Sequence, residues 1–206
     1  MARQVVVAAD RLQRWIDGFA ERHGGATTDV STTEVHLTGG DDAQAWLTVP
    51  FPPLPEDADL AAFVAHVTRS RRVGVLLVRR GGYAVGVFEG PDLVVSKTGS
   101  SYVQGSTKAG GWSQHRFARR RANQARAAFE AAAGGATAVI LPVAGSLDAV
   151  VTGGDRSAVD EVLADSRLAP LRTLVVRPFL AVPDPRLRVL RETPEKYTGV
   201  RVRLDP

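Results

Sequence analysis

The chain has 206 residues, of which 44% are hydrophobic and 23% charged, and it carries a formal net charge of +4. This length allows a substantial core, and we expect one domain over residues 1–206. No apolar run approaches the roughly 20 residues of a membrane helix, and the N-terminal sequence does not form a secretory signal, so we expect a cytoplasmic protein with no membrane partner.

Cysteine is absent, which excludes disulfides, thiolate zinc sites and cysteine nucleophiles. The four histidines show no metal-binding spacing, so we expect no metal and no cofactor. Any chemistry must therefore come from other side chains or from the backbone.

The first third of the chain predicts a helix followed by strands. Apolar residues at helical spacing predict an amphipathic helix over residues 11–23. Alternating residues predict strands over 28–37 and 44–49, joined as a hairpin by a Gly-Gly-Asp-Asp turn. A proline-rich connector then leads to a short helix over 59–70.

The middle of the chain predicts a meander. Strands are expected over residues 72–79, 83–89 and 92–97, separated by Gly-Gly and Gly-Pro, and consecutive strands should be antiparallel. The glycine- and serine-rich segment 98–113 is expected to be a mobile loop. A basic helix is predicted over 114–133.

The last part of the chain alternates between strand-like and helical patterns. We expect strands over 137–142, 148–152, 171–177 and 199–204, and helices over 156–163 and 185–192. The run Gly153-Gly154-Asp155-Arg156 lacks the lysine of a Walker loop and predicts a turn into a helix. A meander followed by β–α alternation predicts an α/β fold, an α+β mixed sheet with flanking helices.

The central segment is strongly basic. No acidic residue occurs between Asp92 and Glu130. The basic residues of this interval are Lys97, Lys108, Arg116, Arg119, Arg120, Arg121 and Arg126. Such a local excess of positive charge is typical of surfaces that bind phosphate, and arginine in particular favours RNA.

The residues just before the basic helix suggest chemistry. Gly110 and Gly111 would let the backbone approach RNA closely. Trp112 would either stack on a base or anchor the loop against the core. Ser113 is a plausible N-cap, which would place Gln114 at the first helical position, where the positive end of the helix dipole favours a phosphate or a developing oxyanion.

These motifs resemble a known family. Gly110-Gly111, Gln114 and the run Arg116-Phe117-Ala118-Arg119 resemble the middle, peptide-releasing domain of eukaryotic and archaeal class-I release factors, in which Gly-Gly-Gln precedes a helix containing Arg-Phe-Ala-Arg. The glutamine of this chain arrives two residues later. It matches the Gly-x-x-Gln variant of the Vms-like release factor (VLRF) family, here Gly111-Trp112-Ser113-Gln114, and the chain resembles a bacterial member.

The resemblance implies a release-factor middle-domain-like fold with RNase H-like architecture. It also implies a peptidyl-tRNA hydrolase that acts in ribosome-associated quality control without reading a stop codon. The implied partners are peptidyl-tRNA and the peptidyl-transferase centre of the ribosomal large subunit, bound by a monomer. The catalytic residues would be Gln114, Gly110 and Gly111. The RNA-binding residues would be Lys108, Trp112, His115, Arg116, Arg119, Arg120 and Arg126.

Two alternatives stay open from the residues alone. The same segment would serve a non-catalytic ribosome- or tRNA-binding module, in which Gln114 has no chemical role. It would also serve a tRNA 3′-end endonuclease, but that chemistry needs a titratable base or a metal, and only His115 or an unassigned carboxylate would supply the base.

Overall fold

The computed structural model describes residues 3–100 and 113–205, and within residues 113–125 it describes the backbone alone. The chain divides into two compact units, Met1–Ser70 with Glu195–Pro206, and Arg71–Pro194. The single domain expected over residues 1–206 thus comprises two units, and along the chain the second is inserted into the first. None of the described helices has both the length and the apolar composition of a membrane span.

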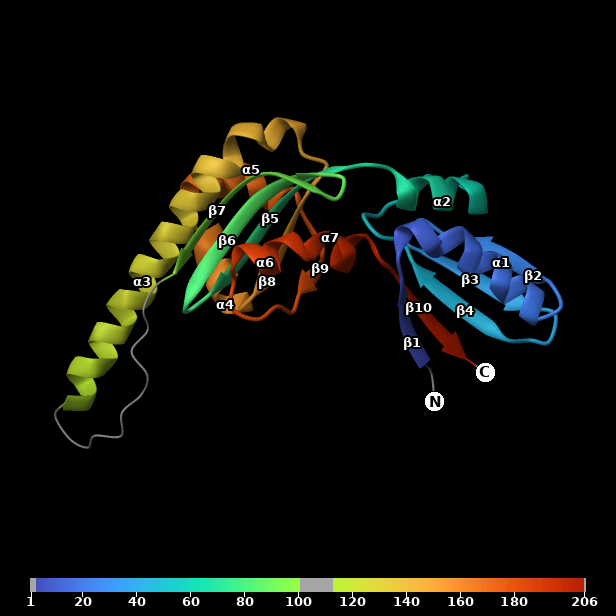
Figure 1. The fold of residues 1–206 in the computed structure, drawn as a ribbon, viewed down its shortest axis with the longest axis horizontal. Helices are drawn as coiled ribbons and strands as arrows, with labels where there is room; N and C mark the ends of the chain where they lie inside the picture. Colours follow the sequence, from blue (N-terminus) through green and yellow to red (C-terminus); the bar gives the residue numbers. More distant parts are fainter. Residues whose placement is uncertain (1–2, 101–112, 206) are drawn as a thin grey trace. The chain divides into compact units, whose positions relative to one another are not determined.

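The first unit is an antiparallel sheet packed against two helices (Figure 1). In the order β1-β10-β4-β3-β2, its strands are β1 (Arg3–Val7), β10 (Val200–Asp205), β4 (Gln44–Thr48), β3 (Glu34–Gly39) and β2 (Ala26–Val30). The two helices are α1 (Leu12–Arg22) and α2 (Leu60–Thr68), and the short 3-10 turn η1 (Ala9–Arg11) precedes α1. Phe19 of α1 and Phe63 of α2 are buried against Leu37 and Leu47 of the sheet. Both predicted helices and the β3–β4 hairpin are therefore confirmed.

The strand expected over residues 28–37 is wrong as a single element. It is divided into β2 and β3, which pair antiparallel. Ser31 closes the turn between them, because its hydroxyl donates to the carbonyl of Glu34 at 2.8 Å and accepts from the Glu34 amide at 3.0 Å. The four consecutive polar residues Ser31-Thr32-Thr33-Glu34 interrupt the alternation between Val30 and Val35, and this interruption was the sequence signal for the turn.

The second unit contains the mixed sheet predicted from the sequence. In the order β7-β6-β5-β8-β9, its strands are β7 (Asp92–Ser100), β6 (Gly82–Glu89), β5 (Arg72–Arg79), β8 (Ala149–Gly154) and β9 (Val175–Leu180). The first three strands along the chain are antiparallel neighbours, while β8 is parallel to β5 and β9 is parallel to β8. In chain order this is 3-2-1-4-5 with only the second strand reversed, the arrangement of an RNase H-like sheet.

Helices cover both faces of this sheet. On one face, α3 (Ser113–Val139) and α4 (Arg156–Leu163) share a core with alternate residues of β5 and β6. On the other face lies α6 (Leu187–Arg191), since a Cβ on Gly86 would lie 3.0 Å from Leu190. The remaining helical segments are η2 (Leu141–Ser146), η3 (Ser166–Leu168), α5 (Ala169–Arg172) and α7 (Thr193–Thr198).

Three expectations for the second unit are corrected. Residues 98–100, predicted as loop, extend β7 and pair with residues 82–84 of β6. The strand expected over 137–142 is wrong, because α3 continues through Gly134-Gly135 to Val139 and is followed by η2. The strand expected over 171–177 starts only at Val175, after the short helix α5.

Candidate nucleic-acid interface

On one side of the second unit's sheet, strands β5, β7 and β8 end beside the start of β6, and the segment that carries the candidate site leaves the sheet there. β5 ends at Arg79 opposite Gly82, and Gly82 in turn lies opposite Ser100, the last residue of β7. β8 ends beside β5, with Val78 paired to Gly154. We call this edge the Ser100 edge. The chain leaves the sheet there, and the described structure resumes at Ser113 with α3.

Glycines fix α3 against this edge. The ring of Tyr83, at the start of β6, is 6% exposed and lies between two glycines. A Cβ on Gly99 of β7 would collide with one side of the ring, and a Cβ on Gly135 of α3 would lie 2.6 Å from the other side. These two glycines therefore act through close packing, and Gly99 belongs to a strand although its sequence neighbourhood suggested a loop.

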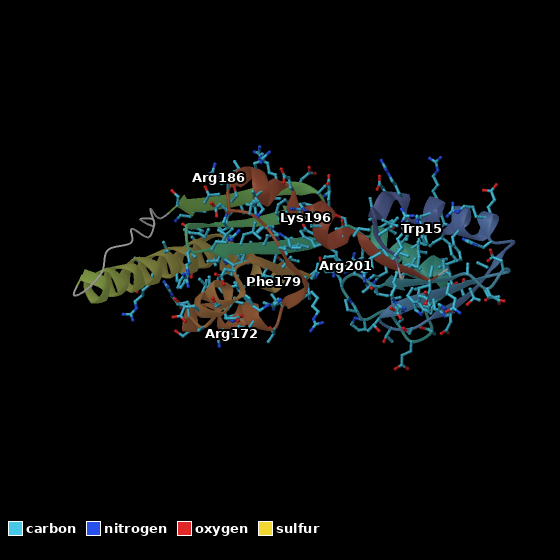
Figure 2. The ribbon with its side chains drawn as sticks, turned by 90° about the horizontal axis from the view of Figure 1, so that it is seen from below. Trp15, Arg172, Phe179, Arg186, Lys196 and Arg201 are labelled. Carbon is cyan, nitrogen blue, oxygen red and sulfur yellow. The ribbon has the colours of Figure 1, made fainter. Side chains whose placement is uncertain are left out.

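The same contacts give the direction of α3. Gly135 lies on Tyr83 near the Ser100 edge, whereas Ile140, just beyond the helix, lies against Gly74 near the opposite edge. At 1.5 Å per residue, α3 therefore runs roughly 33 Å from Gly135 back to Ser113. Its N-terminal part continues past the Ser100 edge, as Figures 1 and 2 both show.

The packed and exposed faces of α3 are distinct where side chains are described. Ala132, Ala133 and Ala136 are almost completely buried in the core, and Phe129 packs against it. Arg126 is exposed. The C-terminal part of α3 therefore packs on the sheet, and its N-terminal part carries the end of the predicted motif.

Apart from Arg126, the predicted site residues divide into two groups. Gln114, His115, Arg116, Arg119 and Arg120 all lie on the first turns of α3, where only the backbone is described. Ser113, expected to cap the helix, is its first helical residue, within the usual one-residue tolerance of such boundaries. The predicted residues that lie outside the described part of the chain are Lys108, Gly110, Gly111 and Trp112.

The Ser100 edge also carries arginines that the sequence analysis did not associate with the site. Arg79 is the last residue of β5, Arg80 comes directly after it, and Arg156 comes two residues after β8; all three are exposed. Arg156 is more than seventy positions from the other two in the sequence, and they come to the same edge because the parallel strands β5 and β8 end there. The sequence signal that could have linked these arginines to the site was a basic residue at or just after the end of two predicted strands. Ligands commonly bind outside the carboxyl ends of parallel strands.

The turn after β8 forms as predicted. Gly154 has a positive φ of 104°, and a Cβ there would collide with the carbonyl of Val78. Asp155 then caps α4, accepting from the Ser157 amide at 3.0 Å and from its hydroxyl at 2.8 Å. The Ser157 hydrogen bond is the main reason that the pKa of Asp155 lies below its usual value. Among the described residues, no group of histidines and carboxylates is arranged to hold a metal ion.

Comparisons with known proteins point to translation. A family model described as the Actinobacteria/Chloroflexi VLRF1 release factor matches residues 71–203, which include the whole second unit. No curated protein sequence matches the chain significantly.

Among solved structures, the crystal structure of the archaeal translation termination factor aRF1 is 18% identical, with a TM-score of 0.47 over 77% of this chain and 45% of that one. A structure titled "Archaeal protein" is 14% identical, with a TM-score of 0.43 over 93% of this chain and 63% of that one. The chain thus spans less than two thirds of either structure.

Proposed function

Because the chain belongs to the Actinobacteria/Chloroflexi VLRF1 release factor family, we propose that it is a peptidyl-tRNA hydrolase. It would release nascent chains from stalled ribosomes or large subunits in ribosome-associated quality control, in the cytoplasm and without reading a codon. The observation that carries the proposal is the position of Gln114, the last residue of the sequence motif, on the first turn of α3, in the part of the helix that extends past the sheet. A motif so placed can enter a narrow site while the sheet stays outside.

The proposed chemistry assigns Gln114 a positioning role. A glutamine amide does not titrate near neutral pH, so it cannot act as a strong general base. It would orient the attacking water and stabilise the tetrahedral oxyanion, at the positive end of the α3 dipole. Gly110 and Gly111 would let the backbone come close to RNA. Proton transfer would then fall to the tRNA ribose and to ribosomal RNA.

The basic residues of the segment would hold phosphates. Arg119 precedes the exposed Arg126 by two helical turns, so the two positions share one side of α3. Arginine suits this role because its guanidinium donates to phosphate in a bidentate manner. The residues proposed for RNA contact are Lys108, Trp112, His115, Arg116, Arg119, Arg120 and Arg126.

The test compares Gln114→Ala with Gln124→Ala, the same chemical change on the same helix outside the motif. Stalled ribosome–nascent chain complexes and isolated large subunits carrying peptidyl-tRNA would be incubated with each protein, and release followed on a gel. Removing an oxyanion donor elsewhere slows catalysis roughly 10²–10³-fold. We expect a loss of that order for Gln114→Ala with binding to the particle retained, and wild-type release for Gln124→Ala.

Other outcomes identify the alternatives. Unchanged release by Gln114→Ala would contradict the assignment of that residue. Binding of the wild-type protein without any release would favour a docking module. A shortened tRNA 3′ end would indicate a nuclease, and His115→Ala would then be the next variant to examine.

A further inference from the structure

The two edges of the second unit's sheet differ in charge. At the edge opposite the Ser100 edge, two arginines face three carboxylates: Arg71 and Arg72, with Glu89, Asp92 and Asp148. Arg72 there lies 3.4 Å from the Glu89 carboxylate and donates its backbone amide to Asp148 at 2.8 Å. At the Ser100 edge lie three arginines, Arg79, Arg80 and Arg156, together with the carboxylate of Asp155, while Asp184 follows two residues after Val182.

The arginines of the Ser100 edge lie close to one another. Gly154 has no side chain beside Arg79, whose Cγ would lie 3.1 Å from a Cβ there. Arg79 donates from Nη1 to the carbonyl of Val182 at 3.1 Å, which fixes its direction along the edge. The positive charge of Arg80 acts on Asp155, the residue before Arg156. Arg79 and Arg80 therefore both lie near Gly154-Asp155, the turn that precedes Arg156.

Arg156 is held by an aromatic ring. Its guanidinium carbon lies 4.2 Å from the ring centroid of Phe179, a residue labelled in Figure 2. Stacking of this kind occupies the face of the guanidinium and leaves its N–H edges directed outward. The carboxylate of the preceding Asp155 already accepts two hydrogen bonds from Ser157. Arg156 is thus pre-oriented with donors available at the surface.

The position of Arg156 is also unfavourable for the helix that it begins. It is the first residue of α4, where the positive end of the helix dipole disfavours a cation. The N-cap Asp155 is the acidic residue that offsets this charge, and its Oδ1 is already hydrogen-bonded to Ser157.

We propose that Arg79, Arg80 and Arg156 bind phosphates of the acceptor stem of the peptidyl-tRNA, as a second contact surface behind the motif. This inference rests on the proposed function. The ester of that substrate lies at the 3′ end of the acceptor arm, and phosphates follow along the arm. α3 places the motif about 33 Å from Gly135 at the Ser100 edge, as its helical rise requires. The helix therefore runs alongside the arm, with the motif at the ester and the arginines at the stem.

The experiment measures binding of a fluorescent acceptor-stem minihelix with a 3′ CCA end as salt is varied. The test variant is Arg80→Gln with Arg156→Gln. Its matched control is Arg188→Gln with Arg191→Gln, which removes two charges from α6 on the opposite face of the sheet. Each charged hydrogen bond to phosphate contributes roughly tenfold in affinity and about one to the slope of log K against log salt. We expect the test variant to lose about tenfold in affinity per arginine and to have a shallower salt slope. Arg80→Lys with Arg156→Lys should recover most of the affinity. The control should bind as the wild type does.

The proposal would be overturned if the test and control variants bound equally well, or if the wild-type protein did not bind the minihelix. A loss seen only with purified large subunits would assign the edge to ribosomal RNA and would also overturn it. Failure of the proposed function is distinguishable, because peptide release is measured separately. Edge arginines that bind the minihelix in a protein without release activity would keep this inference and reject hydrolysis.

Discussion

Two adjacent glycines near the C-terminal end of α3, Gly134 and Gly135, have opposite surroundings. A Cβ on Gly134 would meet nothing within 4 Å, whereas a Cβ on Gly135 would lie 2.6 Å from the Tyr83 ring. That ring cannot move aside, because Gly99 closes its other side. A glycine pair that a sequence pattern treats as a helix end is therefore one open position and one packing contact.

This difference gives a prediction at the scale of single residues. Gly134→Ala is expected to stabilise the protein by up to about 1 kcal/mol, because alanine favours the helix and constrains the unfolded chain. Gly135→Ala is expected to lower the free energy of unfolding by about 1–3 kcal/mol, because the new methyl group overpacks the contact with Tyr83. Urea denaturation of both variants measures this, and equal effects of the two changes would contradict the packing that we describe.

At the scale of elements, α3 connects the packed core to the motif. Among the α3 residues whose side chains are described, the buried ones start at Ala128, and the exposed Ala127 lies immediately before them. A proline at that position would remove a backbone hydrogen bond and clash with the preceding turn. The helix would then be interrupted between the part that packs and the part that carries Gln114.

We therefore expect Ala127→Pro to abolish most peptide release while the core of the second unit stays folded. Ala127→Gln, which retains helix propensity at the same exposed position, should release peptide as the wild type does. Release from stalled complexes and thermal unfolding would be measured together. Full activity of the proline variant would show that the continuity of α3 is not needed.

The elements also show what the sequence can predict. The meander β5–β7 and helix α4 were predicted closely, because hydrophobic alternation and the Asp155 cap are local signals. The continuation of α3 to Val139 was missed, because Gly135 packs on the ring of Tyr83, a contact between residues that are distant in the sequence. The residues of the candidate site from Gly111 to Arg126 could be proposed from the sequence because they are contiguous, and their roles stay a prediction. Arg79 and Arg156 were not, because only the pairing of β5 with β8 brings them together.

At the scale of the whole molecule, the two units have separate hydrophobic cores. Phe63 is completely buried in the first core, and Val162 is 1% exposed in the second. The family match begins at residue 71, the first residue of the second unit, and continues into β10 of the first. The release-factor relationship therefore includes the unit that carries α3, together with the strand that returns to the other sheet.

Separate cores predict separate responses to a cavity. Phe63→Ala should cost about 3–5 kcal/mol, and we expect it to reduce amide hydrogen-exchange protection in β3 and β4 while β5 and β8 stay protected. Val162→Ala should produce the converse pattern. Equal loss of protection in all four strands from either variant would show that the two units unfold as one.

The central claim is that this chain hydrolyses the ester of peptidyl-tRNA, and the most direct measurement is the mass of the released nascent chain. The reaction would be run on stalled complexes in water enriched in oxygen-18, with Gln114→Ala in parallel. We expect a chain with a plain carboxyl terminus that carries one heavy oxygen, an intact tRNA 3′ end, and almost no product from the variant. A released chain still attached to a nucleotide, or equal release by the variant, would contradict the account.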